Sequence, residues 1–206
     1  MPAFLRQGKN TRLSGDERLY LTDDYPKLIE VADRFVVRQE IDNIAWIDLG
    51  GVGVIVDAME HAELADEIIG EITSTLEDVG VGWVINTHTH YDHVALNDAF
   101  RKRWGSVILS RQTADFGPDR QMSLEGNVRS AVFKPLDSGH SPDDCIVWFP
   151  EERVLFTGDI FGWGMIPLVC RLDHRNADIL LAAYRHILSY EADVIVPGHE
   201  IGRAHV

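Results

Sequence analysis

Three histidines and one aspartate fall within six positions of this chain, and this cluster is the feature that most restricts how it can fold. The cluster spans His88 to His93 in the order H-x-H-x-D-H, directly after the apolar run Trp83-Val84-Ile85. A short run rich in Val and Ile is typical of a buried strand. Polar ligand types beside a buried strand need partners, and a Zn, Fe or Mn ion suits both imidazole and carboxylate. Such a site requires further ligands to converge from other loops.

The same arrangement, an apolar strand followed by a tight turn with a ligand-type residue, recurs three more times. The turns are Gly139-His140, Gly158-Asp159 and Gly198-His199. Glycine lets the backbone turn sharply and approach closely at such positions. Each turn alone is a weak signal, but together with the first cluster they make a set. The seven candidate metal ligands are His88, His90, Asp92, His93, His140, Asp159 and His199.

The composition is that of a soluble globular protein, with 206 residues, 45% hydrophobic and 25% charged. We expect a single domain over residues 1–206, with residues 1–30 as an N-terminal lead-in. No apolar stretch approaches the ~20 residues that cross a bilayer, and the amino terminus lacks an apolar signal segment. We therefore expect a cytoplasmic protein without a membrane partner.

The net charge of −14 argues against nucleic acid as the main partner, because phosphate binding relies on basic patches. The one basic cluster, Arg101-Lys102-Arg103, is explained by the negative end of a helix dipole. We expect a small-molecule substrate instead, and a homo-oligomer is left open.

Hydrophobic patterning predicts strands interleaved with helices. The expected strands are residues 31–39, 44–49, 52–56, 83–87, 107–110, 132–136, 145–149, 154–156 and 194–196. The expected helices are residues 63–76, 94–104 and 177–190, whereas residues 111–130 remain unassigned. Gly50-Gly51 is a hairpin turn signal. This order favours two packed sheets with helices outside.

The ordered set H-x-H-x-D-H, G-H, T-G-D and P-G-H resembles the metallo-β-lactamase superfamily over roughly residues 31–200. The resemblance implies an α/β fold, a four-layer αββα sandwich of two mixed β-sheets flanked by helices, with a two-metal site at one edge. It also implies two ligand sets joined by one bridging residue, namely His88, His90 and His140 for one metal, Asp92, His93 and His199 for the second, and Asp159 between them.

The function that this resemblance implies is a binuclear metal-dependent hydrolase of a small-molecule ester, lactone or thioester, using a metal-bound hydroxide. The cofactors would be two divalent metal ions, Zn²⁺ in preference to Fe or Mn. Asp92 is the candidate catalytic residue, which would orient the nucleophile and carry a proton to the leaving group. Asp57 would accept an N–H from a ligand imidazole, or is simply a turn carboxylate.

Residues 142–162 are also similar to the hydrolase-like domain of flavodiiron proteins. A di-iron redox enzyme of that kind, or of the sulfur-dioxygenase kind, is therefore the alternative. Two features oppose it: His90 stands where those proteins carry a ligand glutamate, and only seven residues follow His199, too few for a flavin domain. A third class is a metal-dependent binding protein without turnover. Residues 92–96 also depart from the D-H-x-G-G run of the hydroxyacylglutathione hydrolases.

Some residues outside the ligand set have two interpretations or a purely structural one. Trp163 and Met165, in the loop after Asp159, and Tyr91 are candidate pocket-lining residues, with core packing as the alternative. The remaining histidines and the cysteines are expected to be structural: His61, His174, His186, His205, Cys145 and Cys170.

Overall fold

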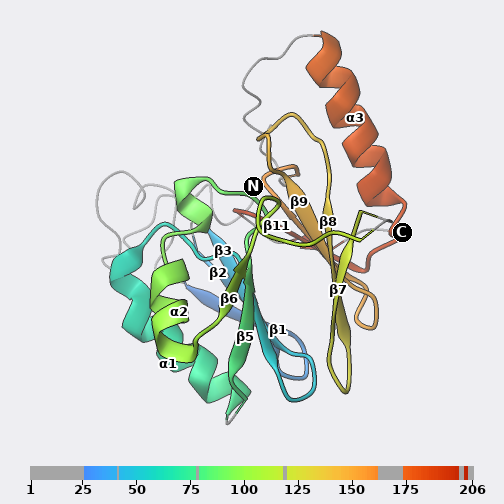
Figure 1. Cartoon of the computed structure of the whole chain (residues 1–206). Coiled ribbons are helices and arrows are strands. Elements are labelled where there is room, and N and C mark those ends of the chain that lie inside the picture. The colour runs from blue at the N-terminus through green and yellow to red at the C-terminus, as the bar shows by residue number, and fades with distance from the viewer. Residues whose placement is uncertain are drawn as a thin grey trace.

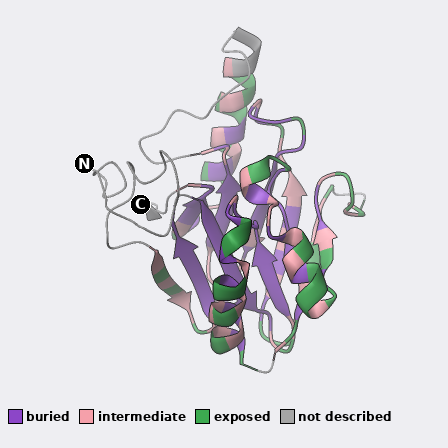
Figure 2. Ribbon diagram, turned by 90° about the vertical axis from the view of Figure 1, so that its left-hand side faces the viewer, coloured by how far each residue is buried: buried purple, intermediate pink, exposed green. Residues whose placement is uncertain are grey.

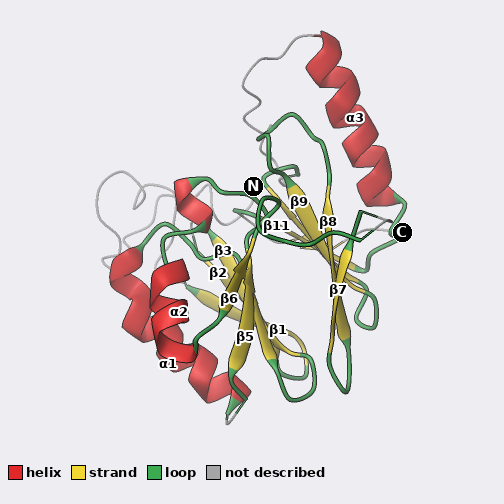
Figure 3. Cartoon of the chain, in the orientation of Figure 1, coloured by secondary structure: helices red, strands yellow, loops and turns green. Residues whose placement is uncertain are grey.

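The computed structural model describes residues 26–40, 42–77, 79–117, 120–161, 174–199 and 202–203. Two six-stranded β-sheets pack face to face, and helices cover their outer faces (Figures 1 and 3). This is the expected four-layer αββα sandwich. Within the described residues, no helix combines the length and the apolar character needed to cross a membrane.

The first sheet has the strand order β1-β2-β3-β4-β5-β6 and the second the order β12-β11-β10-β9-β8-β7. The strands of the first sheet are β1 (Lys27–Ala32), β2 (Phe35–Gln39), β3 (Asn43–Asp48), β4 (Gly53–Val56), β5 (Val81–Ile85) and β6 (Val107–Leu109). The strands of the second sheet are β7 (Met122–Glu125), β8 (Ser130–Pro135), β9 (Cys145–Phe149), β10 (Val154–Gly158), β11 (Val194–Pro197) and β12 (Gly202–Arg203). The helices are α1 (Ala65–Leu76), α2 (Asn97–Trp104) and α3 (His174–Leu188), with the one-turn 3₁₀ helices η3 (Ala62–Leu64) and η4 (Tyr91–His93).

The main core lies between the two sheets and draws buried residues from strands of both, and most of the central strands are coloured as buried in Figure 2. The Phe35 ring from β2 packs against Phe149 from β9, with ring centroids 5.0 Å apart, and stacks on Phe156 from β10 at 6.1 Å. Full burial of one such side chain contributes roughly 1.5–3 kcal/mol. These contacts hold the two sheets together.

Two smaller clusters attach the helices to the outer faces of the sheets. On the first sheet, Ile68 and Ile72 of α1 and Phe100 of α2 pack in one cluster with Trp46. On the second sheet, the apolar side of α3 packs in a cluster that includes Ile187. The helices therefore cover the apolar outer faces of the two sheets.

The structure differs from the sequence expectation at the sheet edges. Residues 31–39, expected as one strand, belong to two antiparallel strands, β1 and β2, which are joined by a turn in which Arg34 has a φ of 54°. Thus β1 begins inside the expected lead-in. In the unassigned region, β7 forms one edge of the second sheet. Both edge strands are only partly buried, so their hydrophobic patterning is weak.

Parallel strand pairs place the loops that matter for function. β5 runs parallel to β4, and β10 runs parallel to β11. Segments that follow the carboxyl ends of parallel neighbours lie side by side. The turns after β10 and β11 therefore meet each other, and the loop after β5 faces them from the other sheet.

Candidate metal centre

The seven residues that the sequence predicts as ligands lie together in two groups. The first group contains His88, His90, His140 and Asp159, and the second contains Asp92, His93, Asp159 and His199. In each group, one donor atom from every residue lies within 4.8 Å of the donor atoms of the others. The structure thus brings every predicted ligand to one place, and their role in holding a metal stays a prediction.

Four separate segments supply these side chains. The segment after β5 carries His88 and His90 and continues into η4, which holds Asp92 and His93. The remaining members come from the second sheet, with His140 between β8 and β9, Asp159 directly after β10, and His199 after β11. The site therefore forms at an edge of the sandwich where loops of both sheets meet.

Two turn glycines are required by crowding at this edge. A Cβ on Gly158 would lie 2.4 Å from Oγ1 of Thr87, and the φ of Gly158 is +52°. A Cβ on Gly198 would lie 2.0 Å from Oδ1 of Asp159 and 2.8 Å from Cε1 of His93. Both positions need glycine because the backbone passes directly against neighbouring side chains of the site.

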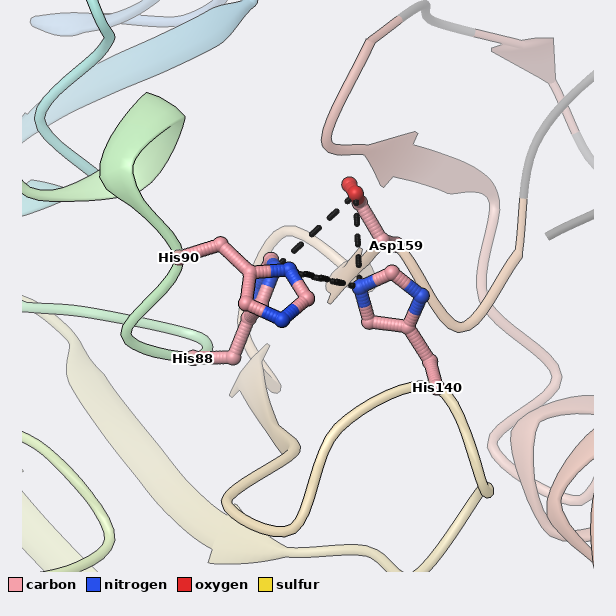
Figure 4. Close-up of side chains that lie close together, drawn as sticks. All are labelled: His88, His90, His140 and Asp159. Carbon is pink, nitrogen blue, oxygen red and sulfur yellow. Dashed lines mark hydrogen bonds and ion pairs between the residues drawn. The ribbon is translucent and has the colours of Figure 1, made fainter. Parts of the chain in front are cut away.

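Three ring nitrogens face one another in the first group (Figure 4). Nε2 of His88 lies 3.0 Å from Nδ1 of His90, and Nε2 of His140 lies 3.2 Å from each of these atoms. A hydrogen bond needs one protonated and one bare nitrogen, so protons cannot pair all three contacts of such a triangle. A cation would satisfy all three lone pairs at once, so this donor set fits a metal ion.

The spacing and the protonation of the first group also suit a metal. Around a tetrahedral zinc with Zn–N distances of about 2.0–2.1 Å, ligand nitrogens lie roughly 3.3 Å apart. Burial and the charge of His93 lower the pKa of His88 to about 3, although the Asp159 carboxylate opposes this shift. The His88 ring is therefore neutral at pH 7 and keeps a lone pair for a ligand.

The second group is richer in negative charge. Nε2 of His93 lies 3.3 Å from an Asp159 oxygen and 3.7 Å from an Asp92 oxygen. Nε2 of His199 lies 3.3 Å and 3.5 Å from the same two carboxylates. Burial lowers the pKa of His199, but hydrogen bonds to Asp159, Asp42 and Asp92 outweigh burial and raise the pKa. This environment favours positive charge, which a divalent cation would supply.

Asp159 lies between the two groups. Its Oδ2 atom is 3.5 Å from Nε2 of His140 and 3.3 Å from Nε2 of His199, whereas its Oδ1 atom faces His93. Burial raises the pKa of Asp159, but hydrogen bonds from His199 and His93 outweigh burial and hold the pKa well below its usual range. The carboxylate is therefore ionised and reaches both groups, as a bridging ligand must.

Two further carboxylates stand behind the second group. Oδ2 of Asp57 lies 3.1 Å from Nδ1 of His93, so Asp57 is close to the ring of a candidate ligand, as expected. Oδ1 of Asp42 lies 3.4 Å from Nδ1 of His199. The sequence carries no signal for Asp42, because this residue belongs to no motif and approaches His199 only through the packing of the two sheets. Such contacts fix the tautomer and orientation of a ring.

Where they are described, the residues expected to be structural belong to neither donor group. His61 contacts Glu60 and Glu63, and Cys145 is a fully buried free thiol. His186 packs against the Tyr190 ring. By contrast, Tyr91 is 73% exposed and therefore does not pack in the core.

Several sequence predictions lie outside the described residues. They concern Trp163, Met165, Cys170 and His205. For His174, the structure describes only its place as the first residue of α3.

Known proteins with similar sequences include two from bacteria. The "Probable polyketide biosynthesis zinc-dependent hydrolase PksB" of Bacillus subtilis is 28% identical over 66% of this chain. A "Hydroxyacylglutathione hydrolase" of Rhizobium meliloti is 25% identical over 82% of this chain. The match covers 65% of each relative's own length, so this chain spans about two thirds of these proteins.

A solved structure supports the fold. The "Metallo-beta-lactamase from Pontibacter korlensis" superposes with a TM-score of 0.70 over 86% of this chain and 93% of that chain, at 17% sequence identity. The family model of the metallo-beta-lactamase superfamily matches residues 37–135 and 124–199, which include all seven candidate ligands. This chain therefore belongs to the metallo-β-lactamase superfamily.

Proposed function

We propose that this chain is a binuclear metal-dependent hydrolase of a small-molecule ester, lactone or thioester. The observation that carries the proposal is the pair of donor groups joined by Asp159. Each group offers imidazole and carboxylate donors in a set that suits zinc. The names of the two relatives, a zinc-dependent hydrolase and a hydroxyacylglutathione hydrolase, support the same class of reaction.

The residues have separate roles in holding the ions. His88, His90 and His140 would hold one divalent ion, His93, His199 and Asp92 would hold the other, and Asp159 would contact both. When bound, such ions polarise a substrate carbonyl and lower the pKa of water towards neutrality. We propose Zn²⁺ as the ion at both positions.

Asp92 is the proposed catalytic residue. Burial raises the pKa of Asp92, but the hydrogen bond from His199 and the charge of His93 outweigh burial, so its net pKa is lowered. The carboxylate is therefore ionised at neutral pH and can accept a hydrogen bond from a nucleophile. It can also receive a proton and pass that proton to the leaving group.

The substrate must approach from the open side of the first group. His90 is exposed, and the neighbouring Tyr91 offers an exposed aromatic ring beside it. Residues 92–96 depart from the D-H-x-G-G run of hydroxyacylglutathione hydrolases. We therefore propose an ester, a lactone or a thioester other than a glutathione conjugate, and with a net charge of −14 we expect no nucleic-acid substrate.

The test combines elemental analysis of the purified protein with an activity screen. Aryl esters, five- and six-membered lactones and simple acyl thioesters are assayed with the untreated, chelator-treated and zinc-reconstituted protein. We expect two zinc ions per chain, hydrolysis of at least one substrate class, and a roughly 10²–10⁴-fold lower rate for Asp92→Asn. Full metal loading without hydrolysis would favour a binding protein, and two irons with O₂ uptake would favour a redox enzyme.

A further inference from the structure

The first donor group depends on two segments that come from different sheets. His88 and His90 lie after β5 of the first sheet, whereas His140 lies between β8 and β9 of the second. Their ring nitrogens are nevertheless held 3.0–3.2 Å apart. A shift of one segment against the other would separate these atoms, so the distance between the segments must be fixed.

Besides the contacts between the histidine rings, hydrogen bonds of other described residues cross between these segments. The backbone N–H of Cys145 donates to the carbonyl oxygen of Thr87, at 2.7 Å. The hydroxyl of Thr89 donates to Oδ2 of Asp143, at 2.6 Å. Thr89 stands between the two ligand histidines of its segment, and Asp143 follows His140 by three residues. The Thr89–Asp143 bond therefore joins the two segments directly beside the candidate ligands.

The surroundings of Asp143 favour an ionised carboxylate that accepts this bond. The residue is only 3% exposed, and its other oxygen, Oδ1, accepts a hydrogen bond from the Ser141 hydroxyl at 2.9 Å. Burial raises the pKa of Asp143, but hydrogen bonds from Thr89, Gln112 and Ser141 outweigh burial and lower it. Hydroxyl bonds to an ionised carboxylate are short, about 2.5–2.7 Å, and stronger than neutral ones.

The next residue, Asp144, has a different role. It accepts a bond from the Ser141 backbone N–H at 2.9 Å and bonds from the hydroxyls of Ser138 and Ser141. All of these partners belong to the loop that contains His140. Asp144 therefore shapes the loop internally, whereas Asp143 connects it to the segment of the other sheet.

We propose that Asp143 is a positioning residue for the first donor group and that it acts through Thr89. The Thr89–Asp143 bond holds the His140 loop against the His88–His90 segment and so fixes the spacing of the three ring nitrogens. This inference rests on the proposed function, because it concerns the affinity of the first group for its ion.

The second group is held by other contacts. The backbone N–H of Asn43 donates to the carbonyl oxygen of Gly198 at 2.6 Å, and the Asn43 side-chain amide donates to the carbonyl oxygen of Pro197 at 2.8 Å. These bonds fasten the turn that carries His199 to the start of β3. Loss of the Thr89–Asp143 bond should therefore weaken one metal position and spare the other.

The experiment measures the two stepwise Zn²⁺ dissociation constants by competition with a chromophoric chelator. It uses the wild-type chain, Thr89→Val, Asp143→Asn, the double variant and Thr89→Ser. Thr89→Val preserves the shape of an exposed side chain and leaves the backbone bond of Thr87 intact. The visible spectrum of the Co²⁺-loaded protein reports the geometry of each position, with His90→Ala and His199→Ala as references for loss of one group.

We expect Thr89→Val to weaken one of the two steps by roughly 10–100-fold, the usual effect of losing a contact behind a ligand. Asp143→Asn should weaken the same step less, because the amide can still bond the Thr89 hydroxyl and only the charge of the acceptor is lost. The double variant should be little worse than Thr89→Val, because that change has already removed the bond. Thr89→Ser, which keeps the hydroxyl, should restore the affinity. The control Thr75→Val, which removes a hydroxyl on α1 that bonds the Glu71 carbonyl, should leave both steps unchanged.

Two results would overturn the positioning role while leaving the proposed function in place. One is a Thr89→Val protein whose two dissociation constants remain within about threefold of the wild type, well below the expected loss. The other is an equal weakening of both steps, which would indicate a general structural effect. A wild-type chain that binds neither Zn²⁺ nor Co²⁺ would instead contradict the proposed function itself.

Discussion

Each imidazole of the first group must present a bare nitrogen to an ion, and its surroundings decide whether it does so. For His88, burial among other rings lowers the pKa and keeps the side chain neutral down to about pH 3. In the second group, carboxylates surround the rings and burial of His93 is offset by Asp57 and Asp159, so the pKa of His93 is raised. A cation entering there must displace a proton, which makes metal affinity rise with pH.

The side chain of His90 gives the cleanest test at this scale. It is exposed, so His90→Ala removes one donor without opening a cavity in the core. We expect the metal content to fall from two ions to one and hydrolysis to fall by roughly 10²-fold or more, because an ion supplies several kcal/mol of charge stabilisation. Elemental analysis and initial rates measure both, and circular dichroism checks that the fold is retained.

His61→Ala is the matched control for that change. His61 contacts only carboxylates of its own segment among the ion pairs described for it, Glu60 and Glu63, and belongs to neither donor group. The variant should keep two ions per chain and most of its activity. A loss of metal and activity as large as that of His90→Ala would show that the ligands have been assigned wrongly.

At the scale of single elements, the turn after β11 shows how closely the backbone approaches the site. A Cβ at position 198 would collide with Oδ1 of Asp159 and with the His93 ring. Gly198→Ala should therefore displace a proposed bridging ligand, weaken metal binding and destabilise the protein by about 1–3 kcal/mol, as overpacking usually does. Thermal unfolding with and without zinc measures both effects, and wild-type affinity in this variant would contradict the crowding.

A glycine in α1 predicts the opposite result. Gly70 lies in the exposed middle of the helix, and a Cβ there would meet nothing within 4 Å. Gly70→Ala should stabilise the fold by about 0.5–1 kcal/mol, because alanine lowers the entropy of the unfolded chain. For a chain of this length, each kcal/mol of added stability raises the Tm by about 2–4 °C. A lower Tm would mean that position 70 makes contacts the structure does not show.

The elements also show what sequence reasoning can and cannot find. Central strands such as β4 and β5 are fully or largely buried, so their apolar runs predict them well. The edge strands β1 and β7 expose alternate residues, and their patterning is too weak to mark their bounds. The two-residue strand β12 is too short to leave any pattern.

At the scale of the whole molecule, the site joins the two halves of the sandwich. The candidate ligands are predictable because each follows a strand in a short motif, and the parallel pairing of β10 with β11 and the packing of the two sheets then bring the turns together. Asp42 and Asp143 are not predictable in the same way. Their contacts with His199 and Thr89 exist only after the sheets have packed, so no local sequence pattern predicts them.

Because the proposed ions connect loops of both sheets, they should stabilise the complete fold. Binding to the folded state adds RT ln(1 + [L]/Kd) per site, about 2.7 kcal/mol when the free ion is at 100 times its Kd. Removal of metal with a chelator should therefore lower the Tm, and added Zn²⁺ should restore it. Differential scanning calorimetry measures the shift. A Tm that neither treatment changes would argue against metal binding at the edge of the sandwich where the candidate ligands lie.

Anomalous X-ray diffraction at the zinc absorption edge, on crystals of the zinc-loaded protein, tests the two-ion site most directly. The site described here predicts two anomalous peaks. One should lie within bonding distance of the ring nitrogens of His88, His90 and His140, and the other beside His93 and His199, with Asp159 contacting both. A single peak, or peaks remote from Asp159, would contradict a binuclear centre.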